Sequence, residues 1–151
     1  ILSGALICGF ARGIVVVLTN GNIIDTILNG AATVLEQTST SICAAGMFVV
    51  QAILHLLVPS GSGQAMLTMP IMVPLADLLH VTRQTACLIF TLADGIGNTI
   101  LPTSGYFMAA LAVAGLSWGQ WAKKMWPFVL GEYLVAIVVV VIANSMGYGP
   151  F

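Results

Sequence analysis

The feature that most constrains this chain is an apolar stretch, residues 85–116, interrupted near its centre by the polar, glycine-rich run ADGIGNTILPTSG (residues 93–105). As one helix, these 32 residues would measure about 48 Å, far more than the roughly 30 Å hydrocarbon core of a bilayer. Two half-helices, Thr85–Ala93 and Tyr106–Leu116, would each measure about 14–17 Å. The stretch therefore predicts a broken transmembrane helix whose break lies near the middle of the membrane.

Composition indicates an integral membrane protein. Of the 151 residues, 59% are hydrophobic and 6% are charged, and the mean hydropathy is +1.06. A soluble domain has about 25% charged residues, so this chain has too little charge to cover a water-facing surface. A net charge of −1 gives no basis for binding nucleic acid. The chain begins at Ile1 without a signal-peptide pattern, and we expect it to be part of a longer polypeptide.

Apolar runs divide the chain into five segments, which predict an all-α integral membrane fold. Residues 1–18 are long enough to span a bilayer, whereas residues 19–37 are too polar and predict an interfacial segment. Residues 38–80 contain two apolar arms around the sequence PSGSG. Residues 85–116 form the broken span, and residues 126–146 form the last span.

Tryptophans and lysines lie together between the broken span and the last span: Trp118, Trp121, Lys123, Lys124 and Trp126. Such clusters mark a membrane–water interface, and an excess of lysine marks the cytoplasmic side. We therefore expect the two lysines in the cytoplasm and Arg83 on the outer side.

Both interruptions have the composition of a helix break followed by a new helix start. In the second, Pro102 disfavours helix at Leu101, glycines permit close approach, and Thr103 or Ser104 can cap the next helix. In the first, Pro59 ends a helix and Ser62 can cap a helix that begins at Gln64.

Backbone without helical hydrogen bonds is tolerated in a membrane only inside protein or beside a water-filled cavity. Helix N-termini favour a carboxylate, and the helix ends near Val58 and Ala93 would offer free carbonyls to a cation. Paired broken elements that supply both kinds of end are typical of secondary transporters. We therefore expect the two breaks to form one binding site.

Asp94 is the acid within the second break, and Asn98, four residues further on, shares its face if helical geometry persists. An ionised acid at the centre of a membrane helix costs about 2.5–3.5 kcal/mol on insertion scales. It therefore contacts a cation, a proton or a substrate amine, or it is a structural partner of a base such as Arg12. His55, alone in an apolar run, is interpreted as a hydrogen-bonded packing residue, with a proton relay as the alternative. Asp77 can pair with Arg83.

No enzyme signature is present. Three cysteines occur without CxxC spacing, and no GxSxG motif or phosphate-binding loop is found. We therefore expect neither catalysis nor a bound cofactor. Transport could be coupled to Na⁺ or H⁺, and a Na⁺ ion would bind near Asp94 and Asn98.

Two long runs, LVPSGSGQAMLTMPIMVPLADLL and ADGIGNTILPTSG, together with ARGIVVVLTNGNIIDTIL and WAKKMWPF, resemble the YfcC-like transporters, the C4-dicarboxylate anaerobic carrier family of the ion transporter superfamily. The resemblance implies two inverted repeats, of which this chain is the C-terminal one, and a re-entrant hairpin at residues 38–80. It also implies a multi-pass protein of the bacterial cytoplasmic membrane, partnered by its own N-terminal half and by a second copy in a homodimer. The tip Ser60–Gly63 departs from the Ser-Asn-Thr of the superfamily's sodium symporters.

The predicted function is secondary transport, as an antiporter or an ion-coupled symporter, of small carboxylate-bearing solutes. An amino acid such as arginine or ornithine would use both Asp94 and a helix N-terminus; a C4-dicarboxylate is the alternative substrate. A channel or a structural membrane subunit is the alternative from another class. The predicted substrate- or ion-binding residues are Ser60, Gly61, Ser62, Gly63, Gln64, Asp94, Gly95, Asn98, Thr99, Pro102, Thr103, Ser104 and Gly105.

Overall fold

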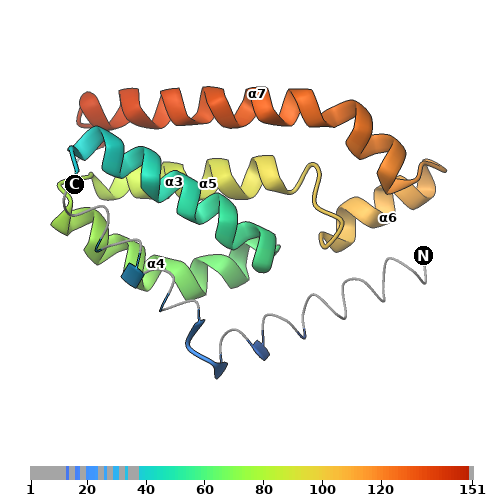
Figure 1. Cartoon of the computed structure of the whole chain (residues 1–151), viewed down its shortest axis with the longest axis horizontal. Coiled ribbons are helices and arrows are strands. Elements are labelled where there is room, and N and C mark those ends of the chain that lie inside the picture. The colour runs from blue at the N-terminus through green and yellow to red at the C-terminus, as the bar shows by residue number, and fades with distance from the viewer. Residues whose placement is uncertain are drawn as a thin grey trace.

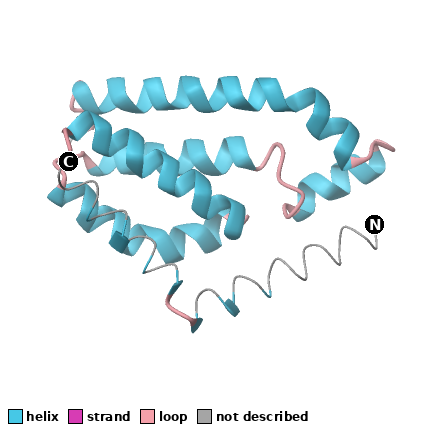
Figure 2. Ribbon diagram, viewed as in Figure 1, coloured by secondary structure: helices cyan, strands magenta, loops and turns pink. Residues whose placement is uncertain are grey.

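The computed structural model describes residues 38–149, together with residues 13, 16, 17, 20–23, 26, 29, 30 and 33. Within residues 38–149 the secondary structure is helical, without strands (Figure 2). The helices are α3 (Thr40–Leu57), α4 (Gly61–Leu78), α5 (Arg83–Gly97), α6 (Gly105–Val113) and α7 (Trp118–Ser145). The predicted span at residues 1–18 and the interfacial segment at 19–37 lie largely outside the described residues, as does Arg12.

The helices are arranged around α5, which lies between α7 and the hairpin arm α4 (Figure 1). α3 packs against both α5 and α7, whereas α3 and α4 contact each other only sparingly. α6 lies at the far end of the molecule, beyond the tip of the hairpin (Figure 1). The largest buried apolar side chains are those of Phe48, Met47, Leu54, Met72, Ile89, Val58 and Val140. The core therefore lies in the half of the molecule that contains the hairpin.

The hairpin predicted at residues 38–80 is present as α3 and α4, joined by a turn of three residues, Val58 to Ser60. Pro59 ends α3, because the residue before a proline is disfavoured in the α conformation. Ser60, rather than the predicted Ser62, caps α4, since its Oγ accepts a hydrogen bond from Gly63 N at 3.3 Å. α4 consequently starts three residues before the predicted Gln64. The re-entrant path of the hairpin through a membrane stays a prediction.

The predicted broken span is also present, but its break is shorter than predicted. α5 continues through Asp94 and Gly95 to Gly97, and helix resumes at Gly105. Glycine within a helix costs only about 1 kcal/mol relative to alanine, so two glycines do not end α5. Asp94 and Gly95 therefore lie on a helix and not in the break.

The last span is longer than predicted. The tryptophan and lysine segment, taken from the sequence as a separate connector, is the first part of α7, and Pro127 is accommodated inside the helix. Gly115, with a φ of 68°, makes the turn between α6 and α7. Two of the described helices, Thr40–Leu57 and Trp118–Ser145, are long and apolar enough to cross a membrane.

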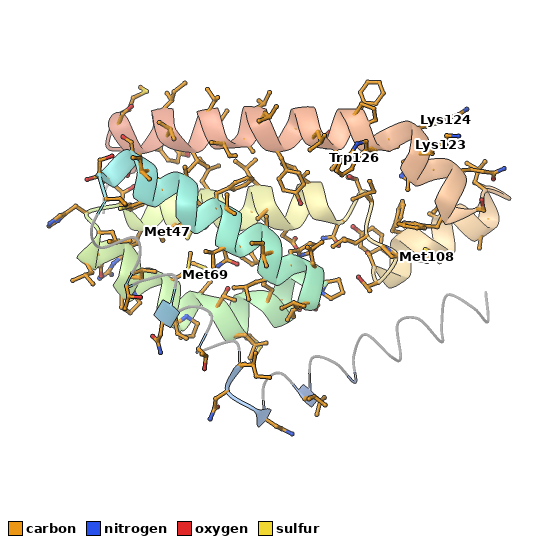
Figure 3. The ribbon with its side chains drawn as sticks, viewed as in Figure 1. Met47, Met69, Met108, Lys123, Lys124 and Trp126 are labelled. Atoms are coloured by element: carbon orange, nitrogen blue, oxygen red, sulfur yellow. The ribbon has the colours of Figure 1, made fainter. Side chains whose placement is uncertain are left out.

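Charged side chains lie at the two ends of the bundle. Arg83 donates to Asp77 at 2.8 and 3.0 Å, which confirms the predicted pair, and this hydrogen bond lowers the pKa of Asp77 and raises that of Arg83. Lys123 and Lys124 lie at the opposite end, on the first turns of α7 (Figure 3). The placement of these charges on opposite sides of a membrane stays a prediction.

Candidate functional site

The tip of the hairpin meets α5 at Asp94. A Cβ atom added to Gly61 would lie 3.1 Å from Asp94 Oδ2 and 3.3 Å from Asp94 Oδ1. Gly61 is the first residue of α4, so the carboxylate lies at the N-terminal end of that helix, where the helix dipole favours negative charge. The helix end that the sequence assigned to a substrate carboxylate is therefore in contact with a carboxylate of the chain itself.

Asp94 has two further side-chain neighbours. Asn98 Nδ2 donates to Asp94 Oδ1 at 3.1 Å, which confirms the expectation that the two residues share a helix face. His55 Nδ1 lies 3.4 Å from the same oxygen. The Asp94 side chain is 24% exposed, whereas that of His55 is 0% exposed. Asp94 thus has a buried side, formed by the hairpin, and a side that is open in this chain.

A buried chain of hydrogen bonds extends from His55 into the hairpin. His55 Nδ1 lies 2.7 Å from Gln64 Oε1, and Gln64 Nε2 donates to Gln51 O at 3.0 Å and to Gln51 Oε1 at 2.7 Å. Gln51 Nε2 donates to Thr68 Oγ1 at 3.0 Å, and Thr68 Oγ1 donates to Gln64 O at 2.9 Å. All four residues are at most 1% exposed. Gln64, which we predicted as a substrate- or ion-binding residue, is therefore an interior residue, as is Thr68.

His55 is buried and hydrogen-bonded, as interpreted from the sequence, whereas Gln51 was not predicted to take part in a polar contact. A signal was available, because Gln51 and His55 are four residues apart on α3, and Gln64 and Thr68 are four residues apart on α4. Residues at this spacing share a helix face. Two such polar pairs, one on each side of a turn, predict facing polar surfaces inside a helical hairpin.

Gly97 allows α5 to approach the imidazole ring. A Cβ atom at Gly97 would overlap His55 Cδ2 and would lie 3.0 Å from His55 Nε2. Gly95, which we predicted as a site residue, is exposed, and a Cβ atom added there would meet no other atom within 4 Å. The close approach expected of these glycines is therefore to a histidine of the same chain and occurs at Gly97.

Backbone carbonyl groups at the break between α5 and α6 accept hydrogen bonds from other groups of the same chain. Trp121 Nε1 donates to Thr99 O at 3.0 Å, and Trp118 Nε1 donates to Ile100 O at 2.8 Å. Gly97 O accepts from Leu101 N at 3.1 Å. The helix end that we expected near Ala93 therefore lies at Gly97, and the carbonyls of Gly97, Thr99 and Ile100 are hydrogen-bonded, two of them by residues predicted as interfacial anchors.

The start of α6 differs from the start of α4. Ser104 occupies the N-cap position, as predicted, but its side chain makes no capping hydrogen bond. Ser104 Oγ is buried and has no hydrogen-bond partner among the described residues. The other predicted residues of this region are partly buried (Thr99, Pro102, Thr103) or exposed (Gly105), and Ser62 of the hairpin tip is exposed as well.

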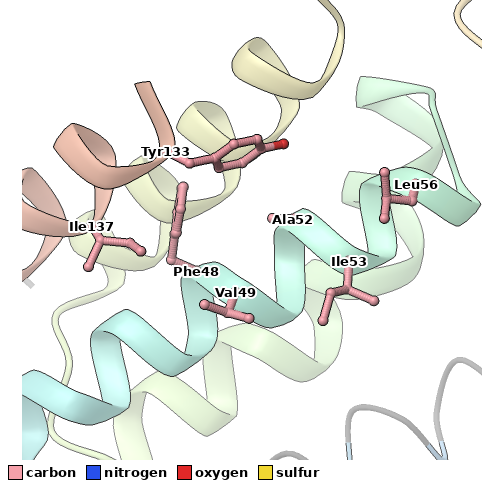
Figure 4. A pocket seen from close by; sticks show the side chains of 7 residues that line it. All are labelled: Phe48, Val49, Ala52, Ile53, Leu56, Tyr133 and Ile137. Carbon is pink, nitrogen blue, oxygen red and sulfur yellow. The ribbon is translucent and has the colours of Figure 1, made fainter. Parts of the chain in front are cut away.

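Two grooves flank α7, and neither contains a predicted site residue. One, of about 290 Å³, is lined by Phe48, Val49, Ala52, Ile53, Leu56, Tyr133 and Ile137 (Figure 4). The other, of about 460 Å³, is lined by Leu92, Ile96, Gly131, Glu132, Val135, Ala136 and Val139. Their linings are predominantly apolar and offer little to a carboxylate. Among the described residues, no group of three or more His, Cys, Asp and Glu could hold a metal ion.

An apolar helical chain in which a hairpin tip meets an interrupted helix at a partly buried acid has features that are typical of membrane transport proteins. The sequence profile of the family described as "C4-dicarboxylate anaerobic carrier" matches residues 1–145. The chain belongs to this family, as the resemblance in its two breaks indicated.

Two relatives are similar over nearly the whole chain. A protein of Escherichia coli (strain K12) described as "Putative basic amino acid antiporter YfcC" is 38% identical over 152 residues, which cover 97% of this chain and 30% of the relative. A Haemophilus influenzae (strain ATCC 51907 / DSM 11121 / KW20 / Rd) protein described as "Uncharacterized protein" is 33% identical over 142 residues, or 94% of this chain and 28% of the relative. The chain thus spans about a third of the length of these relatives. No solved structure matches it.

Proposed function

We propose that this chain forms part of a secondary active transporter that exchanges basic amino acids such as arginine or ornithine across a bacterial cytoplasmic membrane. The observation that carries the proposal is the position of Asp94, a partly exposed carboxylate at the junction of the hairpin and the interrupted helix. An ionisable side chain at membrane depth is costly and marks a substrate or ion pathway by default. The description of the Escherichia coli relative as a basic amino acid antiporter agrees with a basic substrate.

The chemistry around Asp94 favours a cationic substrate group. Its carboxylate lies at the N-terminal end of α4 and accepts from Asn98, so the site holds one negative charge and the donors that support it. A substrate ammonium or guanidinium group adds the missing positive charge. A dicarboxylate bound at Asp94 would instead place its negative charges beside the negative charge of the Asp94 carboxylate, which is unfavourable. Ser104 and Gly105 at the start of α6 offer a helix N-terminus for the carboxylate of the same amino acid.

The family description supports a second candidate, transport of C4-dicarboxylates. In that case Asp94 would not contact the substrate and would serve to hold the hairpin against α5. The two candidates differ in the effect of removing the charge, because an uncharged amide in place of the Asp94 carboxylate would relieve repulsion of an anion but remove the partner of a cation.

The test is substrate counterflow in proteoliposomes that contain the full-length protein, with its N-terminal half and in its own oligomeric state, which we propose to be a homodimer. Arginine, ornithine, lysine, succinate and fumarate are each measured with and without Na⁺. We expect saturable exchange of the basic amino acids, and its loss by more than about 100-fold in Asp94→Asn, the equivalent of about 2.7 kcal/mol.

The matched control is Asp77→Asn, which removes an exposed carboxylate paired with Arg83 and leaves exchange at the wild-type rate. Exchange of succinate without any basic amino acid would establish the alternative substrate. Flux that does not saturate would indicate a channel, and wild-type exchange in Asp94→Asn would remove Asp94 from the site.

A further inference from the structure

The hydrogen bonds inside the hairpin determine the tautomer of His55. The backbone carbonyl of Gln51 can only accept, so the Gln64 atom that lies 3.0 Å from it must be the amide nitrogen. The other end of the Gln64 amide is then the oxygen, which faces His55 Nδ1 at 2.7 Å. Because this oxygen can only accept, Nδ1 must carry the hydrogen.

The second ring nitrogen, Nε2, is consequently the free basic site of the neutral imidazole. Nε2 is buried and has no hydrogen-bond partner among the described residues. Gly97 packs directly against it, so the ring lies against backbone without a side chain between them. A buried polar atom without a partner is rare in folded proteins and calls for a specific explanation. A proton is a ligand that Nε2 can take without any enlargement of this site.

The charge that such a proton would add has one partner within the described part of the chain. His55 lies against Gln64 of α4 and against Asp94 and Gly97 of α5, and of these three residues Asp94 is the one with an ionisable side chain. On α7, which also packs against α3, Tyr133 contacts Phe48, and Glu132 is exposed beside the groove along α5. A buried imidazolium therefore depends on the Asp94 carboxylate, 3.4 Å away, for compensation.

We propose that His55 is a proton-binding residue of the transporter, and that the proton on His55 Nε2 and the cationic group of a basic amino acid compete for the Asp94 carboxylate. The proposal rests on the transport function proposed above. One carboxylate compensates one positive charge, so a substrate cation at Asp94 leaves the imidazolium uncompensated in a buried position. The proton then leaves Nε2 for the solvent, and the neutral ring keeps its hydrogen on Nδ1.

Because of this competition, the charge of the substrate determines whether the protein releases or takes up a proton when the substrate binds. A cation that binds at Asp94 releases a proton, which gives exchange of a proton for a basic amino acid. A dicarboxylate, in contrast, would bind more tightly to the imidazolium form and would take up a proton.

The first experiment measures the protons released when arginine binds to the full-length protein. Calorimetric titrations in buffers of different ionisation enthalpy give this number at a pH between about 5 and 8, where histidine titrates. We expect release of up to about one proton per arginine by the wild type and no release by His55→Gln. The control His80→Gln removes the other histidine of this chain, which is exposed, and should release as many protons as the wild type. Equal release by His55→Gln, no release by the wild type, or proton uptake would overturn the proposal.

A second experiment tests the proton site without transport or substrate. Nitrogen-15 spectra of histidine-labelled full-length protein identify His55 by the signal that His55→Gln loses. We expect a neutral ring with its hydrogen on Nδ1, protonation at Nε2, and a smaller protonated fraction in Asp94→Asn than in the wild type at the same pH. A neutral ring with its hydrogen on Nε2, or equal protonated fractions in the two proteins, would contradict the assignment.

The two experiments separate the two proposals. If the wild type binds arginine but His55→Gln releases the same number of protons, the transport function stands and the role of His55 is wrong. If the wild type binds no basic amino acid, the proposed function and the competition both fail, and the nitrogen-15 titration still decides whether His55 holds a proton beside Asp94.

Discussion

The chain is interrupted twice, and the two interruptions differ in what their polar groups contact. At the tip of the hairpin, Ser60 caps α4, and the side chains behind the tip are joined in a buried network. Between α5 and α6, indole groups of α7 satisfy two carbonyls, but Ser104 caps nothing. The polar groups at the first interruption are hydrogen-bonded within α3 and α4, the two helices that it joins. Those at the second interruption depend on hydrogen bonds from α7, a helix further along the chain.

Under the proposed function, this difference separates an element with a paired polar interior from one with an unpaired cap. Hydrogen bonds within a buried polar network rigidify the elements that it joins. In the hairpin, Gln51, Gln64 and Thr68 are paired with one another, whereas at the start of α6 the buried hydroxyl group of Ser104 has no partner among the described residues. The hairpin tip therefore meets Asp94 of α5 as a hydrogen-bonded unit, and Ser104 is a polar group of the second interruption that is left unpaired.

The largest expected effect on stability comes from removing the buried hydrogen bonds behind the hairpin tip. Gln64→Leu removes the hydrogen-bond partner of His55 Nδ1 and of Gln51 Oε1, both of them buried. Each buried group left unpaired costs about 1–3 kcal/mol, so the free energy of unfolding of the full-length protein in detergent should fall by that amount per group. Gln84→Leu, at an exposed position on α5, is the control and should leave it nearly unchanged. Equal stability of the two variants would mean that the network does not hold the tip together.

Next in size is the loss of close packing between α5 and the hairpin. Gly97→Ala places a methyl group against the imidazole ring of His55, which overpacks the junction at a cost of about 1–3 kcal/mol. We expect lower thermal stability and slower counterflow in the full-length protein. Gly95→Ala, two residues earlier on the same helix, meets no atom within 4 Å and should be neutral or slightly stabilising. Similar behaviour of the two alanine variants would contradict the close approach at Gly97.

A smaller effect tests whether the second interruption depends on α7. Trp121→Phe keeps the aromatic contact with Phe107 but removes the N–H group that donates to Thr99 O. The loss of one such hydrogen bond is worth about 0.5–1.5 kcal/mol, measured as a lower free energy of unfolding. Trp126→Phe, at an exposed position further along α7, provides the baseline. If both variants lose the same stability, the indole of Trp121 does not support the break.

The smallest effects compare the two cap residues directly. Ser60→Ala removes a capping hydrogen bond and should cost about 1 kcal/mol in the free energy of unfolding. Ser104→Ala removes a side chain that makes no such bond and should change stability by less than about 0.5 kcal/mol, while it reduces substrate affinity if Ser104 contacts the substrate. A loss of stability at Ser104 as large as at Ser60 would remove the distinction between the two interruptions.

Several features of the fold could be predicted because they depend on local sequence. Length and hydropathy predict the helices, Pro59 predicts the end of α3, and the spacing of Asp94 and Asn98 predicts that they share a helix face. The break itself was predicted too early in the chain. Glycine lowers helix stability only slightly, and the packing of α5 against the hairpin compensates this cost as far as Gly97.

The features that could not be predicted depend on contacts between distant segments. Nothing local to His55 indicates that α5 will bring Asp94 to it, since 39 residues separate the two positions (94 − 55). The tryptophans had a sufficient explanation as interfacial anchors, so their hydrogen bonds to Thr99 and Ile100 were not expected. The pairing of Gln51 with Gln64, in contrast, joins two successive helices. It could have been predicted from the spacing of four residues between the polar side chains on each helix.

The pairing of Gln51 with Gln64 inside one hairpin has a consequence for the biosynthesis of the protein. Gln51, Gln64 and Thr68 find their partners within a single helical hairpin, so a nascent chain can pair all three amide and hydroxyl groups before α5 has left the ribosome. The hairpin can therefore leave the translocation channel with these groups already hydrogen-bonded to one another. Only the contact of His55 with Asp94 must wait for the next helix, and its formation marks the moment at which the hairpin docks.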